Sequence, residues 1–166
     1  MLRSVGYGGF SVIRRFGVGS NVFKRGFADV AAENKLRLNF VLPHLAIKKD
    51  ALVDMVVIPA SSGMMGVLPQ HAPTVAQMRP GILSVHSGDT VDKYFVSSGF
   101  TFVHNDRTDV CAIEAVSIED IDPQAVSEGL SEAESKMSSA SSDLEKAEAQ
   151  IAYEVYTAMN AAVTQK

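Results

Sequence analysis

The side chains able to do chemistry are few and scattered along the chain. The four histidines, His44, His71, His86 and His104, stand singly, without the short spacings that bring two imidazoles to one metal ion. His71 is the best candidate for a general base, but no serine or cysteine near it lies in a nucleophile elbow. Cys111 is the sole cysteine, which excludes an internal disulfide and a cysteine-based metal cluster. Its apolar, strand-like flanks predict a buried, inert thiol.

The most specific feature is a run of glycines and prolines, Gly63-Met-Met-Gly-Val-Leu-Pro-Gln-His-Ala-Pro73. It is not a phosphate loop, because no Lys-Ser or Lys-Thr pair follows the second glycine. Glycine permits positive φ or a close chain approach, and each proline fixes φ, so we expect a rigid loop. Such a loop is suited to docking onto another surface, and it can equally form a structural corner. The methionines between the two glycines favour an adaptable contact surface.

The elements that position this run are predicted from hydrophobic periodicity. The residues from Leu36 to Leu42 alternate between apolar and polar, as in a strand with one face inward. Six further short runs, rich in β-branched residues and separated by turn residues, follow the same pattern. They are Leu45–Ala51, Val53–Ile58, Gly81–His86, Val91–Val96, Gly99–Val103 and Val110–Val116. Together they predict an antiparallel β-sandwich or barrel, with a long turn-rich segment from Pro59 to Pro80.

After Ile118 the period changes to that of a helix. Asp122 and Pro123 predict an N-cap followed by proline at the first helical position. Ser142 and Glu145 form a capping-box pattern for a second helix. The expected apolar stripes are Val126, Leu130, Ala133 and Met137 on the first helix, and Leu144, Ala147, Ile151, Val155, Met159 and Ala162 on the second. The short connection between the helices predicts an antiparallel α-helical hairpin.

Charge is distributed unevenly along the 166 residues. The first 27 residues contain five cations and no acid, which is typical of a mitochondrial transit peptide, with cleavage expected near Ala28. The remaining chain holds 15 − 5 = 10 basic and 19 acidic residues, a formal charge of −9 that argues against nucleic-acid binding. Apolar stretches are too short for a membrane span. The expected organisation is a transit peptide over 1–27, a sandwich over 28–118 and a hairpin over 119–166.

The sequence resembles the delta (bacterial epsilon) subunit family of F-type ATP synthase. The resemblance extends from Leu36 to Val163. It rests on the motif Gly63-x-x-Gly66-Val67-Leu68-Pro69-x-His71-x-Pro73, on Pro80-Gly81 and on Ser98-Gly99-Phe100. It implies a β-sandwich followed by two antiparallel helices. It also implies a central-stalk subunit on the matrix side of the mitochondrial inner membrane that transmits torque and performs no chemistry.

The resemblance also implies partners and contact residues. The partners would be the gamma subunit, the polar loops of the c-ring and the small mitochondrial epsilon subunit. The contact segment would be Gly63, Met64, Met65, Gly66, Val67, Leu68, Pro69, His71 and Pro73. Many relatives have a carboxylate where this chain has Met64. No cofactor is expected, because the arginines that bind ATP in bacterial relatives are absent: no arginine follows Ala112.

Two alternatives belong to other functional classes. One is a free-standing binding module of the mitochondrial matrix, and the other is a small matrix hydrolase that uses His71 or Cys111. A catalytic reading needs a pocket with a cluster of titratable groups, and the sequence offers no such cluster. Co-purification with a large complex separates the stalk hypothesis from both alternatives.

Overall fold

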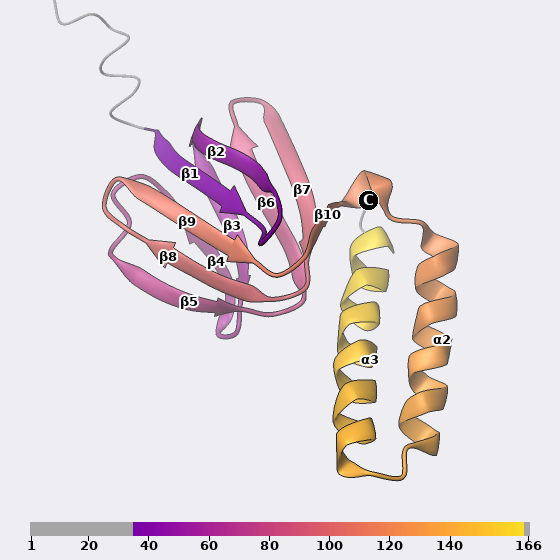
Figure 1. The fold of residues 1–166 in the computed structure, drawn as a ribbon. Helices are drawn as coiled ribbons and strands as arrows, with labels where there is room; N and C mark the ends of the chain where they lie inside the picture. The colour runs from indigo at the N-terminus through magenta and orange to yellow at the C-terminus, as the bar shows by residue number, and fades with distance from the viewer. Residues whose placement is uncertain (1–34, 165–166) are drawn as a thin grey trace, which may run out of the picture.

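The computed structural model describes residues 35–164. The predicted transit peptide lies outside this range. Ten strands come first, followed by a short 3-10 helix and two long α-helices (Figure 1). The strands are β1 (Leu36–Val41), β2 (Ala46–Val53), β3 (Met55–Ala60), β4 (Gly63–Val67), β5 (Thr74–Met78), β6 (Gly81–Ser87), β7 (Thr90–Val96), β8 (Gly99–Val103), β9 (Arg107–Ala112) and β10 (Ala115–Ser117).

The strands form one continuous sheet that folds over itself into a sandwich, as the sequence predicted. Its order is β10-β7-β6-β3-β5-β8-β9-β1-β2, and β4 pairs with β3 off this path. In Figure 1 the layer of β5, β8, β9 and β1 lies in front of the layer of β3, β6 and β7. Every pairing is antiparallel except that of β1 with β9, which is parallel. The strands of that pair are far apart in sequence, so the chain between them supplies the crossover that a parallel pairing needs.

The segment from Pro59 to Pro80 differs from the expected rigid loop, because it contains two strands, β4 and β5. A turn at Ser61 and Ser62 returns the chain antiparallel to β3, and Gly63, with φ of 130°, begins β4. Pro59 is tolerated inside β3, where its carbonyl accepts a hydrogen bond from the Arg79 amide on the side away from β4. The glycines and prolines that suggested a loop therefore shape a tight hairpin.

The core lies between the two layers and follows the predicted alternation. On β1, Leu36, Leu38 and Phe40 are buried, and the Phe40 ring meets Tyr94 edge-on, with ring centroids 5.4 Å apart. Residues from the opposite layer complete this core, including Ile58, Val67, Leu83, Val85 and Val96. Full burial of each such side chain stabilises the fold by about 1.5–3 kcal/mol.

The helical hairpin consists of η1 (Ile118–Asp120), α2 (Pro123–Ser139) and α3 (Asp143–Thr164). Both predicted caps are present. The Asp122 carboxylate accepts the Gln124 N–H at 2.9 Å. The Ser142 hydroxyl accepts the Glu145 N–H at 3.2 Å, while the Glu145 carboxylate accepts the Ser142 N–H at 3.1 Å. These bonds satisfy amides that the first turn of a helix leaves without a partner.

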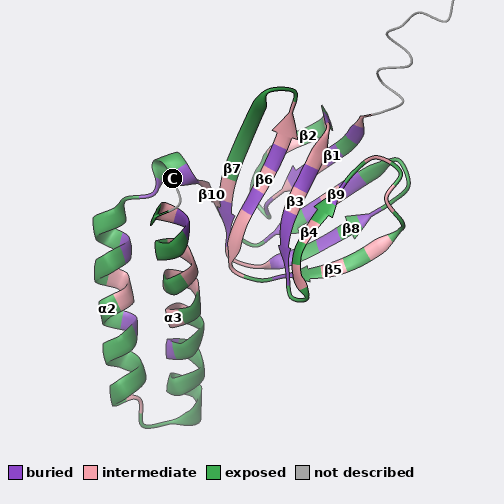
Figure 2. Ribbon diagram, turned by 180° about the vertical axis from the view of Figure 1, so that it is seen from behind, coloured by how far each residue is buried: buried purple, intermediate pink, exposed green. Residues whose placement is uncertain are grey.

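Only the root of the hairpin packs against the sandwich. Phe95 and Ile118 form a second apolar cluster with residues of both helices, among them Val126, Val155, Met159 and Ala162. The other half of the hairpin projects away from the sandwich, as Figures 1 and 2 show. This chain alone therefore covers only part of the two predicted apolar stripes. Leu144 and Ile151 are 69% and 64% exposed, and Met137 is exposed as well.

Candidate docking surfaces

The structure divides the predicted contact segment between a strand and a connection. Gly63 to Val67 form β4, and Leu68 to Pro73 lead from β4 to β5. The connection is ordered by hydrogen bonds: the His71 amide donates to the Leu68 carbonyl at 3.2 Å, and Gln70 adopts a φ of 63°. The connection is thus ordered, whereas the first part of the segment is a strand and not part of the expected loop.

The nine predicted contact residues are not equally accessible. Met64 is 62% exposed, and Gly66, Leu68 and Pro73 are also exposed. Val67 is fully buried in the core, which excludes a direct contact by its side chain. The remaining members, Gly63, Met65, Pro69 and His71, are half-buried, and Met65 packs against the core.

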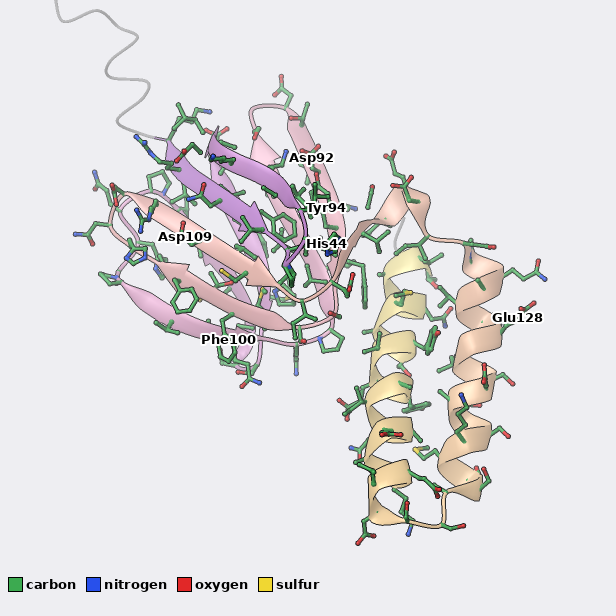
Figure 3. All side chains as sticks on the ribbon, viewed as in Figure 1. His44, Asp92, Tyr94, Phe100, Asp109 and Glu128 are labelled. Atoms are coloured by element: carbon green, nitrogen blue, oxygen red, sulfur yellow. The ribbon has the colours of Figure 1, made fainter. Side chains whose placement is uncertain are left out.

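A second apolar surface, which the sequence reasoning did not single out, covers the outer face of β5 and β8. We call Val75, Phe100 and Phe102 the outer patch. They are 67%, 51% and 38% exposed. The register places Val75 opposite Phe102, and Figure 3 shows Phe100 on β8 in the front layer. The signal in the sequence was a strand that is apolar on both of its faces, since Thr101 is the only polar residue of Gly99–Val103.

Cys111 extends this surface, which corrects the prediction of a buried thiol. It is exposed, and it lies opposite Phe100 on one side and Val41 on the other. Partial desolvation, together with the nearby Asp109 carboxylate, raises the pKa of the Cys111 thiol. A raised pKa lowers the fraction of reactive thiolate near neutral pH.

Polar groups border the outer patch where β9 meets β1. The Asp109 carboxylate accepts the side-chain amide of Asn39 at 2.7 Å and the Arg107 Nε–H at 3.0 Å. His104 Nε2 lies 3.5 Å from the same carboxylate. The cluster ties the parallel pair of strands together, and it gives the apolar surface a charged rim of the kind found around protein interfaces.

The geometry does not support the hydrolase alternative. His71 Nδ1 lies 2.8 Å from the Ala72 carbonyl, so its ring is engaged with backbone of its own loop. The hollow beside Cys111 is lined by residues of β1, β2, β8 and β9, and His71 is not among them. Within residues 35–164, no group of three or more His, Cys, Asp or Glu side chains is arranged to hold a metal ion.

Comparison with known proteins decides the family. A family model described as the ATP synthase, Delta/Epsilon chain, beta-sandwich domain matches residues 35–118. A protein of Agaricus bisporus named ATP synthase subunit delta, mitochondrial, is 40% identical over 84% of this chain and 86% of its own length. The chain belongs to the ATP synthase delta/epsilon family.

Other members of the delta/epsilon family extend the comparison. ATP synthase subunit delta', mitochondrial, of Ipomoea batatas is 52% identical over 79% of this chain, and the match spans 66% of that relative's length. The chain also resembles a subunit in a cryo-EM structure of the Euglena gracilis mitochondrial ATP synthase, described as OSCP/F1/c-ring in rotational state 1. The TM-score is 0.73 and the identity 32%, covering 78% of this chain and 82% of that one. Within residues 35–164, neither α-helix combines the length and the hydropathy that crossing a bilayer would need.

Proposed function

We propose that this chain is a non-catalytic central-stalk subunit of the mitochondrial F-type ATP synthase. It would couple proton-driven rotation of the c-ring to the gamma subunit, and so to ATP synthesis, without a cofactor. Its relatives are named as delta subunits of this enzyme, and its structural neighbour comes from an assembly containing F1 and the c-ring. The subunit would lie on the matrix side of the inner membrane as a peripheral component.

The observation that carries the proposal is the outer patch. Two phenylalanines and a valine are exposed to solvent next to one another, although the sandwich buries many other apolar side chains in its core. A cluster of exposed aromatic side chains with a charged rim is typical of a surface that a partner protein covers. We assign the outer patch to gamma. The exposed part of the Met64 to Pro73 segment is assigned to the c-ring loops, and the small mitochondrial epsilon subunit completes the partner set.

Cys111 provides a direct test, because it is the only thiol of the chain and borders the outer patch. In the isolated subunit a maleimide should label the exposed Cys111 thiol, at a rate that rises with pH because the thiolate is the nucleophile. In the detergent-solubilised ATP synthase, purified through another subunit, the chain should be present in stoichiometric amount and Cys111 should be protected. A chain that never enters the complex would refute the stalk assignment, and a fully labelled Cys111 in the complex would refute the assignment of the patch.

Two matched variants separate docking from general loss of stability. Phe100→Ser removes an exposed ring from the outer patch, and Leu144→Ser removes an exposed side chain of similar hydrophobicity from the hairpin. Both changes are at the surface, so the melting temperature of the free subunit should change little. Phe100→Ser should lower retention in the complex more than Leu144→Ser does. Equal retention of the two variants would argue against docking through the patch.

A further inference from the structure

Strand β4 has one free edge. It pairs with β3 through five consecutive residues, from Val56 opposite Val67 to Ala60 opposite Gly63. Within residues 35–164 no other strand pairs with it. Its second edge therefore presents backbone groups that no strand of this chain uses.

The register identifies those backbone groups. A two-residue turn is closed by a hydrogen-bonded pair, here Ala60 and Gly63. Hydrogen-bonded and non-hydrogen-bonded pairs alternate along an antiparallel ladder, so Met65 and Val67 also bond to β3. The N–H and C=O groups of Met64 and Gly66 consequently point away from β3. Pro59 agrees with this assignment, since it lies opposite Met64 and has no N–H to donate.

The free edge lacks the usual protection against strand pairing. Exposed edges are normally blunted by charged side chains, prolines or bulges. Residues 55–78 contain no Asp, Glu, Lys or Arg, although charged residues make up 20% of the whole chain. The register of β4 with β3 is unbroken by a bulge. An uncharged edge is complementary to an uncharged strand, because a charged strand would lose hydration there without gaining a counter-charge.

Gly66 supplies an independent observation. A glycine inside a strand weakens it, and the usual reasons for one are a positive φ or a crowded Cβ position. Neither applies here: Gly66 has no positive φ, and a Cβ would meet only the Met55 sulfur, at 3.9 Å. Gly63, by contrast, has a φ of 130°. The fold of this chain therefore does not require glycine at position 66, whereas a bulky side chain on an added strand would fill the bare site.

We propose that the free edge of β4 accepts an uncharged, extended segment of a rotor partner as an additional strand. The segment hydrogen-bonds to the N–H and C=O groups of Met64 and Gly66, and places a bulky apolar side chain over Gly66. This inference rests on the proposed function, and it specifies how the contact segment binds. Main-chain hydrogen bonds supply the affinity in this mode of recognition, and side-chain fit supplies the specificity.

Amide-resolved hydrogen exchange tests the proposal on the wild-type chain. In the free subunit the Met64 and Gly66 amides should exchange fast, while the Met65 and Val67 amides are protected by β3. In the purified ATP synthase, the Met64 and Gly66 amides should slow at least tenfold. Unchanged exchange of these two amides in a complex that retains the subunit overturns the added strand and leaves the stalk assignment intact. Absence of the subunit from the complex overturns both.

Two substitutions at one position add a second test. Gly66→Pro removes the outward N–H, whereas Gly66→Ala keeps it and adds a methyl group for which the fold has room. We expect Gly66→Ala, which keeps the N–H but partly fills the bare site, to be retained a few-fold less than wild type, and Gly66→Pro at least tenfold less than Gly66→Ala. Equal retention of two folded variants would contradict the proposal. If Gly66→Pro does not fold in isolation, the exchange of the wild-type amides decides the question.

Discussion

Gly99→Ala should be among the most damaging single-methyl changes in this chain. Gly99 begins β8 with a φ of 146°, a conformation that side chains with a Cβ rarely adopt. An added Cβ would lie 2.2 Å from the Cys111 carbonyl oxygen and 2.8 Å from the Ala112 Cα, both in the neighbouring strand. These are backbone atoms of a paired strand, so no side-chain rotation can relieve the clash.

The expected magnitude follows from two contributions. Backbone strain at such a φ costs about 1–3 kcal/mol. Overpacking against fixed atoms adds about 1–3 kcal/mol. The free energy of unfolding should therefore fall by roughly 2–6 kcal/mol. For a chain of this size each kcal/mol corresponds to about 2–4 °C in melting temperature.

Urea and thermal unfolding of the isolated subunit, followed by circular dichroism, measure this effect. Gly66→Ala is the matched control, because the same methyl group meets only an ordinary contact there. Its melting temperature should stay within about 2 °C of wild type. The reasoning would be refuted if Gly99→Ala and Gly66→Ala melted together.

Three further predictions concern stability. The pKa of Asp54 is lowered, mainly by the hydrogen bond from the Gly88 N–H and next by the Lys35 ammonium. The stability that these contacts contribute is therefore fully present above the ordinary aspartate pKa, and it is lost as pH falls through the lower pKa of the folded state. In acid titrations, Asp54→Asn should therefore lose less stability than wild type below pH 4, about where aspartates protonate. Gly129→Ala should destabilise the hairpin, since its Cβ would lie 2.4 Å from the Tyr156 ring, and adding Tyr156→Ala in a double-mutant cycle should remove most of that penalty. Thr101→Val should stabilise the free subunit against urea by about 1 kcal/mol, because it replaces a buried hydroxyl that has no hydrogen-bond partner within residues 35–164.

The parts of the fold that could be predicted from the sequence are those governed by local rules. Alternation along β1 indicated which residues face the core, because a strand has only two faces. Asp122 and Ser142 marked the starts of both helices, because capping chemistry depends on neighbours in the chain. Strands β4 and β5 were missed for a related reason. Their glycines and nearby prolines are turn residues by local rules, and only pairing with β3 and β8 makes them strands.

The remaining errors concern surfaces that depend on the arrangement of whole elements. The apolar stripe of α3 is continuous in sequence, but only its C-terminal half reaches the sandwich, so Leu144 and Ile151 remain exposed. Periodicity cannot indicate where the supporting surface ends. Cys111 was misplaced for a different reason: it shares one face of β9 with Arg107 and Asp109, so alternation along the strand directs it outward, whereas the prediction rested on the apolar residues next to it in sequence. The contact segment stays a prediction from its motif, and the structure adds which of its residues are exposed.

The outer layer of the sandwich shows why such failures of local rules are informative. On β8 the polar side chain of Thr101 is buried, while its neighbours Phe100 and Phe102 face solvent, which inverts the arrangement that hydrophobic burial favours in an isolated domain. Thr108 on the adjacent strand is buried in the same way, and neither hydroxyl has a hydrogen-bond partner within residues 35–164. Each costs stability of about 1–3 kcal/mol. Departures from local consistency concentrate where a sequence serves function, and here the departure coincides with the outer patch. A partner that covered the patch would bury the two aromatic rings, so that only the buried threonines would still be unfavourable. The stability of this subunit would then depend on its place in the complex.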